Sequence, residues 1–556
     1  MRAATAARLG AAAVTGALLA AARPPLDVGP LACVAFVPLF VAWRGRSVRA
    51  TVGYTFLAAV IYYALLMSWS WYFGAIAIVP LVLVLATYWA VAGAILAWLR
   101  GRGVANPFLI ASVWVLAEAT VARVPFGGFS WGEVGYAFHN IELGRALASD
   151  GGVELVTFFA VALNGLLADA VANAWNRRSV PPVAWLGVAA GLALVVGIPI
   201  VADAVRSPPH PDGTIRVAIV QGEDIDRDLT AAEVADRYLP KSHFQLAAEI
   251  HDHVDLVIFP ESSMDADPRT DPYLRSNIVA IARRTHAWVL ANAVANAPAA
   301  GGQPAGAKAL NLDVLFAPDG TVEGTYAKRH LVPFGEYVPF RAELEGHIKE
   351  LNRIPRDFEP GHSKGLFEIA GHKVATIICF ESAFGYQVRP LVHAGAQVIV
   401  VSTNNRSYER SANSAQHVAI GQMRAAETGR PLVQAAISGI SAIIDANGVV
   451  HQHTALFQRT LLEATVTATT GETPYVRYGE WAIWACALAL VAAAGFALQR
   501  GGRSRFIDSL PRAADEPTSV GSRFAGDETV AACRPALNGN LTSDTASPSE
   551  TSGDSA

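Results

Sequence analysis

Long apolar stretches constrain the fold of this 556-residue chain more than any other feature. A helix needs roughly 20 mainly apolar residues to cross about 30 Å of hydrocarbon, and eight stretches meet or approach that length. They comprise residues 6–22, 26–43, 50–71, 75–99, 107–121, 153–175, 183–204 and 481–498. A composition of 52% hydrophobic and 16% charged residues also favours a membrane protein over one ordinary soluble domain.

The basic residues between these stretches predict their orientation, because short basic loops tend to remain in the cytoplasm. They are Arg2, Arg8, Arg44, Arg46, Arg49, Arg100, Arg102, Arg177, Arg178, Arg500, Arg503 and Arg505. All fall on one side if both termini are cytoplasmic, which places residues 206–478 outside the cytoplasm. Cleavage of the first stretch as a signal peptide is an alternative that leaves this placement unchanged.

Residues 206–478 show a different pattern, in which short β-branched runs alternate with polar, helix-compatible segments. The runs predict strands over residues 215–222, 254–261, 287–294, 373–380 and 397–404. Asp319-Gly320 and Asn447-Gly448 indicate hairpins, and residues 234–251 and 414–428 favour helices. This is the pattern of one α/β domain.

The predicted organisation has four parts. A seven-helix membrane region covers residues 1–205, the catalytic domain covers 206–478 and an eighth helix covers 479–500. Residues 501–556 are rich in Ser, Thr, Ala, Asp and Gly and predict a disordered cytoplasmic tail. The net charge of −4 gives no basic field, so the sequence predicts no nucleic-acid partner.

The distribution of the four cysteines singles out one of them. Cys33 and Cys486 lie in apolar stretches and Cys533 lies in the tail, which leaves Cys379 as the sole thiol of the predicted extracytoplasmic domain. Such a thiol is either buried and inert or reactive. Cys379 ends a strand-like run, where a nucleophile and the backbone N–H of Phe380 can face the same pocket.

Two further residues complete a candidate constellation. Glu261 ends a buried strand, where an unpaired carboxylate would be costly, although it could simply lie at the start of a helix. Lys328 follows a hairpin strand, where an isolated lysine would usually be solvated. Considered one at a time, each of these residues has an ordinary structural explanation.

Taken together, the motifs resemble a known superfamily. FPESS, YAKRHLVPFGEYVPF and ICFES carry Glu261, Lys328 and Cys379 in the order and at the spacing of the Glu-Lys-Cys triad of nitrilases. With the seven preceding stretches, PFGGFSWGEVGY from residue 125 and TPYVRYGEW from residue 473, the chain resembles the apolipoprotein N-acyltransferases over nearly its whole length up to the tail. The resemblance implies an eight-helix membrane bundle carrying an extracytoplasmic nitrilase-like α-β-β-α sandwich.

The resemblance also implies a reaction in the bacterial cell membrane. A fatty acyl group moves from a membrane glycerophospholipid to the α-amino group of the S-diacylglyceryl-cysteine that begins an apolipoprotein. Glu261 acts as the base, Cys379 forms a thioester, and Lys328 with the N–H of Phe380 stabilises the oxyanion. This chemistry requires no metal or cofactor.

Several neighbouring residues are expected to support or modify this site. The resemblance assigns Glu336 and Glu381 supporting roles, although either could form an ion pair with Arg329 or Arg356. His330 is expected to be a hydrogen-bonded structural residue. The aromatic PFGGFSWGEVGY segment could line the entrance for an acyl chain, and Trp131→Ala would then slow acylation of Cys379.

One segment departs from the family pattern. Many relatives have an Asn-Asp-Ala-Trp-Phe type sequence after the strand that follows the nucleophile, whereas this chain has Asn405, Arg406 and Tyr408 within residues 404–410. The change leaves the triad intact but affects the expected shape of the lid and its acyl or lipoprotein preference.

Two other functions remain as alternatives. A membrane-tethered amidase would need a pocket open to water, and a soluble substrate gives no reason for eight spans. A transporter or scaffold would use ionisable groups inside the spans, for which Glu118, Asp169 and Asp203 are the main candidates. Hydrogen bonding at helix ends or between helices would equally explain these three residues.

Overall fold

The computed structural model describes residues 2–175, 181–206, 209–223, 225–227, 229–299 and 304–509. Arg177, Arg178, Cys533 and the predicted tail beyond residue 509 lie outside the described residues. The membrane helices and the sandwich domain belong to one compact unit, Met1–Arg503.

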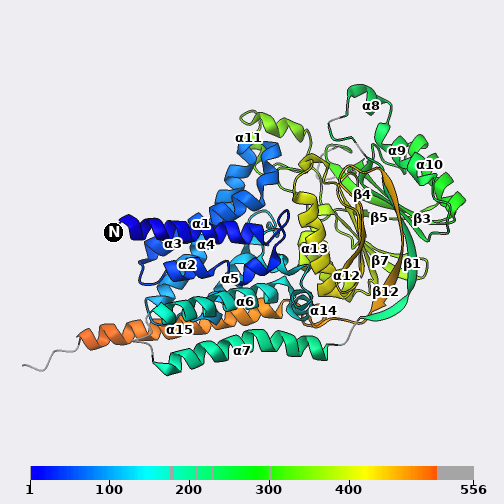
Figure 1. The fold of residues 1–556 in the computed structure, drawn as a ribbon. Coiled ribbons are helices and arrows are strands. Elements are labelled where there is room, and N and C mark those ends of the chain that lie inside the picture. The colour runs from blue at the N-terminus through cyan, green and yellow to red at the C-terminus, as the bar shows by residue number, and fades with distance from the viewer. Residues whose placement is uncertain are drawn as a thin grey trace, which may run out of the picture. The chain divides into compact units, whose positions relative to one another are not determined.

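Within the described part of the chain, six helices are long and apolar enough to cross a membrane. They are α1 (Arg2–Ala21), α3 (Val48–Leu66), α4 (Ala75–Arg100), α6 (Glu142–Trp175), α7 (Pro182–Val205) and α15 (Trp481–Ser509) (Figure 1). The predicted combination of a multi-span helical region and an α/β sandwich is confirmed. The predicted number of eight spanning helices is not confirmed.

The second and fifth predicted spans account for the difference in number. Residues 26–43 form two short pieces, η1 (Gly29–Cys33) and α2 (Val37–Ala42). Asn164 of α6 accepts a hydrogen bond from the backbone N–H of Phe36 at 2.8 Å and donates to the carbonyl of Ala32 at 2.8 Å. These bonds satisfy backbone groups at the break, as a non-helical segment among membrane helices requires.

The fifth predicted span, α5 (Pro107–Val121), is continuous but short. Its 15 residues extend about 22 Å at 1.5 Å per residue, which is less than the hydrocarbon thickness. By contrast, α6 begins before its predicted start and is interrupted at Gly151 and Gly152, so that its second segment starts at Val153 as expected.

The three ionisable residues considered as candidates for a transport pathway have partners. Glu118 accepts hydrogen bonds from the backbone N–H of Val134 at 3.0 Å and from the Thr157 hydroxyl at 2.8 Å. Asp169 pairs with Arg44, and Asp203 pairs with Arg206 at 2.7 Å. These contacts agree with the helix-end and interhelix explanation and do not indicate a transport pathway.

Two six-stranded mixed sheets form the sandwich. The first sheet has the order β12-β1-β2-β3-β4-β5, with β12 (Thr460–Thr470), β1 (His210–Gln221), β2 (Leu256–Met264), β3 (Trp288–Asn296), β4 (Ala309–Phe316) and β5 (Val322–Ala327). The second has the order β11-β10-β9-β8-β7-β6, with β11 (Val450–His453), β10 (Ala442–Ile444), β9 (Leu432–Ala436), β8 (Val398–Thr403), β7 (His372–Ile378) and β6 (Leu366–Ile369).

Apolar side chains join the layers into α-β-β-α order. Ile258 of the first sheet and Val400 of the second belong to one buried cluster between the sheets. A second cluster joins the first sheet to α9 (Tyr238–Ala247) and α10 (Pro272–Thr285), and a third joins the second sheet to α12 (Gly385–His393) and α13 (Asn413–Thr428). Helix α13 also packs against α6 and therefore connects the two regions.

All five predicted strands and both predicted hairpins are confirmed. The predicted helix over residues 234–251 is wrong as a single element, because α8 (Ala231–Ala235) and α9 are separated at Arg237, which has a left-handed φ of 60°. The remaining short helices are η2 (Ser68–Phe73), η3 (Val134–Phe138), α11 (Arg341–Leu344), η4 (Lys349–Arg353), η5 (Cys379–Ala383), η6 (Arg406–Tyr408) and α14 (Pro474–Tyr478).

Candidate active site

Glu261 lies in β2 and is buried. Its Oε1 accepts hydrogen bonds from Asn311 Nδ2 at 2.6 Å and from Lys328 Nζ at 3.3 Å. Its Oε2 accepts the backbone N–H of Asn404, which follows β8 of the second sheet, at 2.8 Å. The carboxylate is therefore held by both sheets in one orientation.

Lys328 follows β5 and is paired with two carboxylates. Its Nζ also contacts Glu336 Oε1 at 2.9 Å, and Glu336 Oε2 accepts the backbone N–H of Val332 at 2.8 Å. Burial lowers the pKa of Lys328, but the charges of Glu261 and Glu336 outweigh it, so the pKa lies well above its usual value. Lys328 is a buried ammonium, not the solvated residue that its local sequence would suggest.

Cys379 is the first residue of η5 and has a left-handed φ of 52°, which is uncommon for a residue other than glycine. Burial and the charge of Glu261 raise the pKa of its thiol to about 12, against the opposing effect of Lys328. The thiol is thus protonated near neutral pH, and nucleophilic attack needs a base. Burial also raises the pKa of Glu261, against the opposing charge of Lys328, which favours a carboxylate that can accept a proton.

Glu381 binds backbone groups on both sides of the site. Its carboxylate accepts the N–H groups of Arg329 at 2.8 Å, His330 at 3.1 Å and Ile378 at 2.8 Å, as well as the hydroxyl of Tyr326. Glu381 therefore joins the segment that carries Lys328 to the turn that carries Cys379. These contacts, and the Glu336 contact with Lys328, replace the alternative ion pairs with Arg329 or Arg356.

Phe380 and Trp131 form an aromatic layer beside Cys379. The Phe380 ring is buried and stacks on Trp131 with centroids 6.2 Å apart. Trp131 is only 3% exposed, and its Nε1 donates to Gln416 Oε1 of α13 at 2.8 Å. The aromatic segment thus reaches the site as expected, but Trp131 supports Phe380 and is not an open part of an entrance.

His330 differs from its expected role. Its ring is buried against Phe384, with centroids 3.9 Å apart, and burial lowers its pKa to about 4. Among the residues that the structure describes, its Nε2 has no hydrogen-bond partner. The ring is therefore a neutral packing group, and the prediction of satisfied hydrogen bonding is wrong for this nitrogen.

The segment that departs from the family pattern is anchored at several points. Tyr408 packs edge-on against Trp69 and Phe73 of η2, with centroid distances of 4.9 and 5.6 Å. Arg406 pairs with the buried Glu223 at 2.7 Å, and the Asn405 amide also bonds within the domain. An aromatic contact to the membrane region is thus present here, through Tyr408.

Sequence reasoning missed three polar contributors. Asn311 bridges Glu261 and Glu336, with its Nδ2 3.0 Å from Glu336 Oε1. Ser382 Oγ bonds to the carbonyl of Cys379 at 2.9 Å, and His417 Nε2 lies 2.8 Å from the same hydroxyl. The available signal was the polar Asn311 in the otherwise apolar segment ALNL of β4.

Comparisons with known proteins agree with this geometry. Residues 15–166 match the family model of the apolipoprotein N-acyltransferase N-terminal domain, and residues 216–475 match that of carbon-nitrogen hydrolases. The apolipoprotein N-acyltransferase of Geobacter metallireducens is 30% identical over 511 residues, covering 88% of this chain and 95% of its own length. This chain belongs to the apolipoprotein N-acyltransferase family.

Other relatives show the same extent of similarity. The apolipoprotein N-acyltransferase of Azotobacter vinelandii is 29% identical over 515 residues, covering 88% of this chain and 94% of its own. The apolipoprotein N-acyltransferase of Vibrio vulnificus is 27% identical over 504 residues, covering 85% of this chain and 94% of its own length. As a member of the apolipoprotein N-acyltransferase family, the chain is a membrane-embedded acyltransferase of the nitrilase superfamily and acts in lipoprotein N-acylation.

Proposed function

We propose that this enzyme transfers a fatty acyl group from a membrane glycerophospholipid to an apolipoprotein through a thioester on Cys379. The acceptor is the α-amino group of an N-terminal S-diacylglyceryl-cysteine. The single observation that carries the proposal is the convergence of Lys328 and the Asn404 N–H on the Glu261 carboxylate, beside Cys379, whose thiol pKa is raised by burial.

In the first half-reaction, Glu261 removes the thiol proton as the sulfur of Cys379 attacks the ester carbonyl of the phospholipid. The ammonium of Lys328 and the N–H of Phe380 stabilise the tetrahedral oxyanion. The C–O bond then breaks, the alkoxide of the lysophospholipid takes the proton from Glu261, and a thioester remains. Glu336 and Asn311 fix the positions of the charged groups.

In the second half-reaction, the acceptor amine attacks the thioester carbonyl. Glu261 accepts a proton from the amine, the C–S bond breaks, and the sulfur leaves and regains a proton, so that amide and free enzyme result. The two substrates use the site in turn, which is ping-pong chemistry.

The proposed location follows from the distribution of arginines in the sequence. Both termini are cytoplasmic and the sandwich domain is extracytoplasmic. The donor then reaches the site from the outer leaflet of the bacterial cell membrane, to which the spanning helices anchor the domain. The partners of the enzyme are therefore a phospholipid, a diacylglyceryl-modified apolipoprotein and the bilayer.

Intact-mass analysis after incubation with phospholipid tests the proposal, with Cys379→Ala as the matched control. We expect an acyl mass increment on the wild-type protein that is absent from the variant and is discharged by a diacylglyceryl-cysteine peptide. Discharge by water alone would favour a hydrolase. A folded wild-type preparation without any increment would overturn the assignment of Cys379 as nucleophile.

A further inference from the structure

The turn that begins with Cys379 has a strained backbone that its surroundings must hold in place. A non-glycine residue in the left-handed region is strained and persists only where neighbouring structure fixes it. Inside the turn, Ser382 Oγ donates to the carbonyl of Cys379, and Glu381 accepts the N–H of Ile378. Ala383 ends η5 and is held from outside.

The external contact at Ala383 comes from the membrane region. The hydroxyl of Tyr136, in η3 between α5 and α6, donates to the Ala383 carbonyl at 3.0 Å. Tyr136 is fully buried, and burial raises its pKa, so the phenol remains a donor. A residue 247 positions away in sequence thus fixes the end of the nucleophile turn.

An ion pair on α13 orients the Tyr136 hydroxyl. Arg424 Nη2 donates to this oxygen at 2.9 Å, while its Nη1 lies 2.7 Å from Glu427 Oε2. Glu427 Oε1 accepts a hydrogen bond from the backbone N–H of Val153 at 2.8 Å. Val153 is the first helical residue after the break in α6. The chain of contacts therefore runs from a membrane helix through α13 and Tyr136 to the nucleophile turn.

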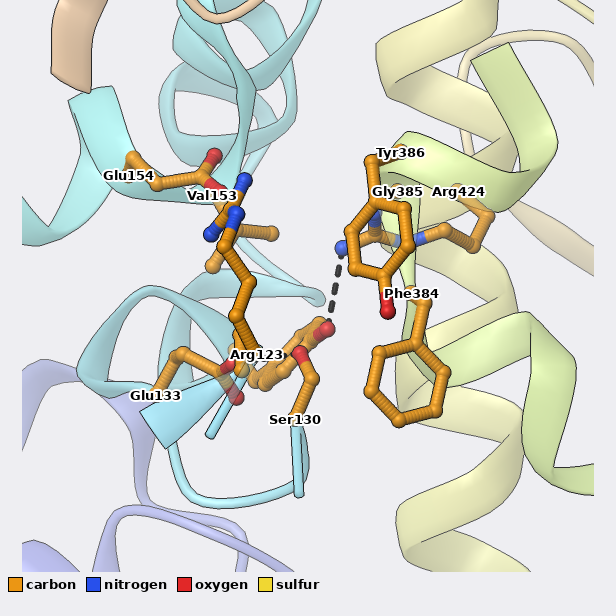
Figure 2. A pocket seen from close by; sticks show the side chains of 11 residues that line it. Arg123, Ser130, Glu133, Val153, Glu154, Phe384, Gly385, Tyr386 and Arg424 are labelled. Carbon is orange, nitrogen blue, oxygen red and sulfur yellow. Dashed lines mark hydrogen bonds between the residues drawn. The ribbon is translucent and has the colours of Figure 1, made fainter. Parts of the chain in front are cut away.

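In Figure 2, Arg424, Phe384 and Gly385 lie on one side of the pocket and Ser130 and Glu133 lie on the other, and a dashed line marks the Arg424 hydrogen bond. The cavity between them has a volume of about 10 Å³, roughly the space of one water molecule. Packing around the Arg424 guanidinium is close, because a Cβ on Gly385 would lie 2.1 Å from Arg424 Nη1. The group that orients the tyrosine hydroxyl therefore has little freedom to move.

We propose that Tyr136, oriented by the Arg424–Glu427 ion pair, is a positioning residue that holds the Cys379 turn in its reactive conformation. The membrane region would then contribute to the chemistry itself as well as to anchoring. The acylation readout used below rests on the proposed function, whereas the alkylation readout does not.

The test is Tyr136→Phe, which keeps the ring and removes only the hydroxyl. We expect the maximal rate of Cys379 acylation by phospholipid vesicles to fall about tenfold, with the phospholipid KM within about twofold, because small misplacements of reacting groups are costly. Because the Cys379 turn loses this support, the rate of Cys379 alkylation by iodoacetamide should also differ from the wild-type rate by at least about threefold.

Tyr62→Phe is the matched control. Tyr62 is also buried, and its hydroxyl donates to the carbonyl of Gly132 in the same connecting segment at 2.9 Å, without touching the nucleophile turn. Tyr62→Phe should leave the rates of Cys379 acylation and Cys379 alkylation near their wild-type values. Equal slowing in the two variants, or unchanged rates in Tyr136→Phe, would overturn the proposal.

A double variant covers the case in which Tyr136→Phe does not fold. Arg424→Gln with Glu427→Gln removes both charges of the ion pair, and it should produce the same fall in maximal rate without a change in KM. Altered alkylation without any acylation in the wild type would retain the positioning role while rejecting the proposed function. Wild-type rates in the folded double variant would overturn the role of the ion pair.

Discussion

The Cys379 turn, the nucleophile half of the site, is supported by both the sandwich domain and the membrane region, whereas the contacts described for the charged half lie in the sandwich domain. Glu261 and Lys328 belong to the first sheet, and the partners described for them all lie in the sandwich domain. The Cys379 turn follows the second sheet, and Tyr136 and Trp131 of the membrane region support it. The sandwich domain therefore supplies the charged groups, and the membrane region helps to hold the turn that carries the sulfur of Cys379.

The largest effect should come from the charged half. Glu261→Gln keeps the side-chain shape but removes the proposed base, so acylation of Cys379 should fall about 10³-fold or more. Single-turnover mass analysis with phospholipid measures this rate, and Cys379→Ala sets the background. A fall below about tenfold would mean that another group takes the thiol proton.

The pH dependence of Cys379 alkylation tests the electrostatic link between the halves. Because burial and Glu261 raise the thiol pKa to about 12, the neutral thiol dominates below that pH. The rate with iodoacetamide should therefore rise about tenfold per pH unit between pH 7 and 9, as the thiolate fraction does. A plateau within this range would show that Lys328 outweighs burial and Glu261.

Glu336→Gln should produce an intermediate effect. The charge of Glu336 raises the pKa of Glu261, so its removal should lower that pKa and shift the acidic limb of the acylation profile to lower pH. The maximal rate should fall about tenfold to a hundredfold, because Glu336 positions Lys328 and small misplacements of reacting groups are costly. Glu345→Gln, at a mostly exposed carboxylate 65% accessible to solvent, is the control and should leave the limb in place.

The smallest effect should come from the aromatic support of the nucleophile half. Trp131→Phe keeps an aromatic ring near Phe380 and removes the hydrogen bond to Gln416, which is worth about 1 kcal/mol, so acylation should slow about threefold to fivefold. Trp175→Phe, at an exposed position, should have no effect on the vesicle assay. A loss approaching that of Glu261→Gln would remove the distinction between the two halves.

The resemblance to the nitrilase motifs predicted the charged half and Cys379, because each of these residues considered alone also had an ordinary structural explanation. Glu261 lies within β2, which continues to Met264, so the predicted strand end at Glu261 is wrong, whereas Cys379 directly follows the apolar strand β7. The motif around Lys328 identified the family. Asn311 was not predicted because alternation along one strand does not reveal which neighbouring side chains it will meet. Tyr136 was not predicted as a partner of Ala383 because that contact depends on the packing of α13 against α6.

In the membrane region, too, some features could be predicted from the sequence and others could not. The apolar stretches located the helices, but hydropathy alone could not show that residues 26–43 would fold as two pieces. That outcome depends on Asn164, which lies far away in sequence and supplies hydrogen bonds at the break. The left-handed residue between α8 and α9 is Arg237, which is not glycine. The local signal was Pro240, which the structure places in the first turn of α9, where proline is tolerated.

Gln416 of the sandwich domain forms hydrogen bonds with the membrane region, so the two regions cannot be separated without loss of these contacts. Its amide uses both donors on the carbonyls of Pro24 and Leu66 and its oxygen on Trp69 and Trp131. A water-soluble fragment made from residues 206–478 would keep both sheets and the Glu261 to Lys328 contact, yet it would lose all four partners of this side chain. Such a fragment should therefore be a poor surrogate for inhibitor screening, since compounds would meet a nucleophile turn without its native support.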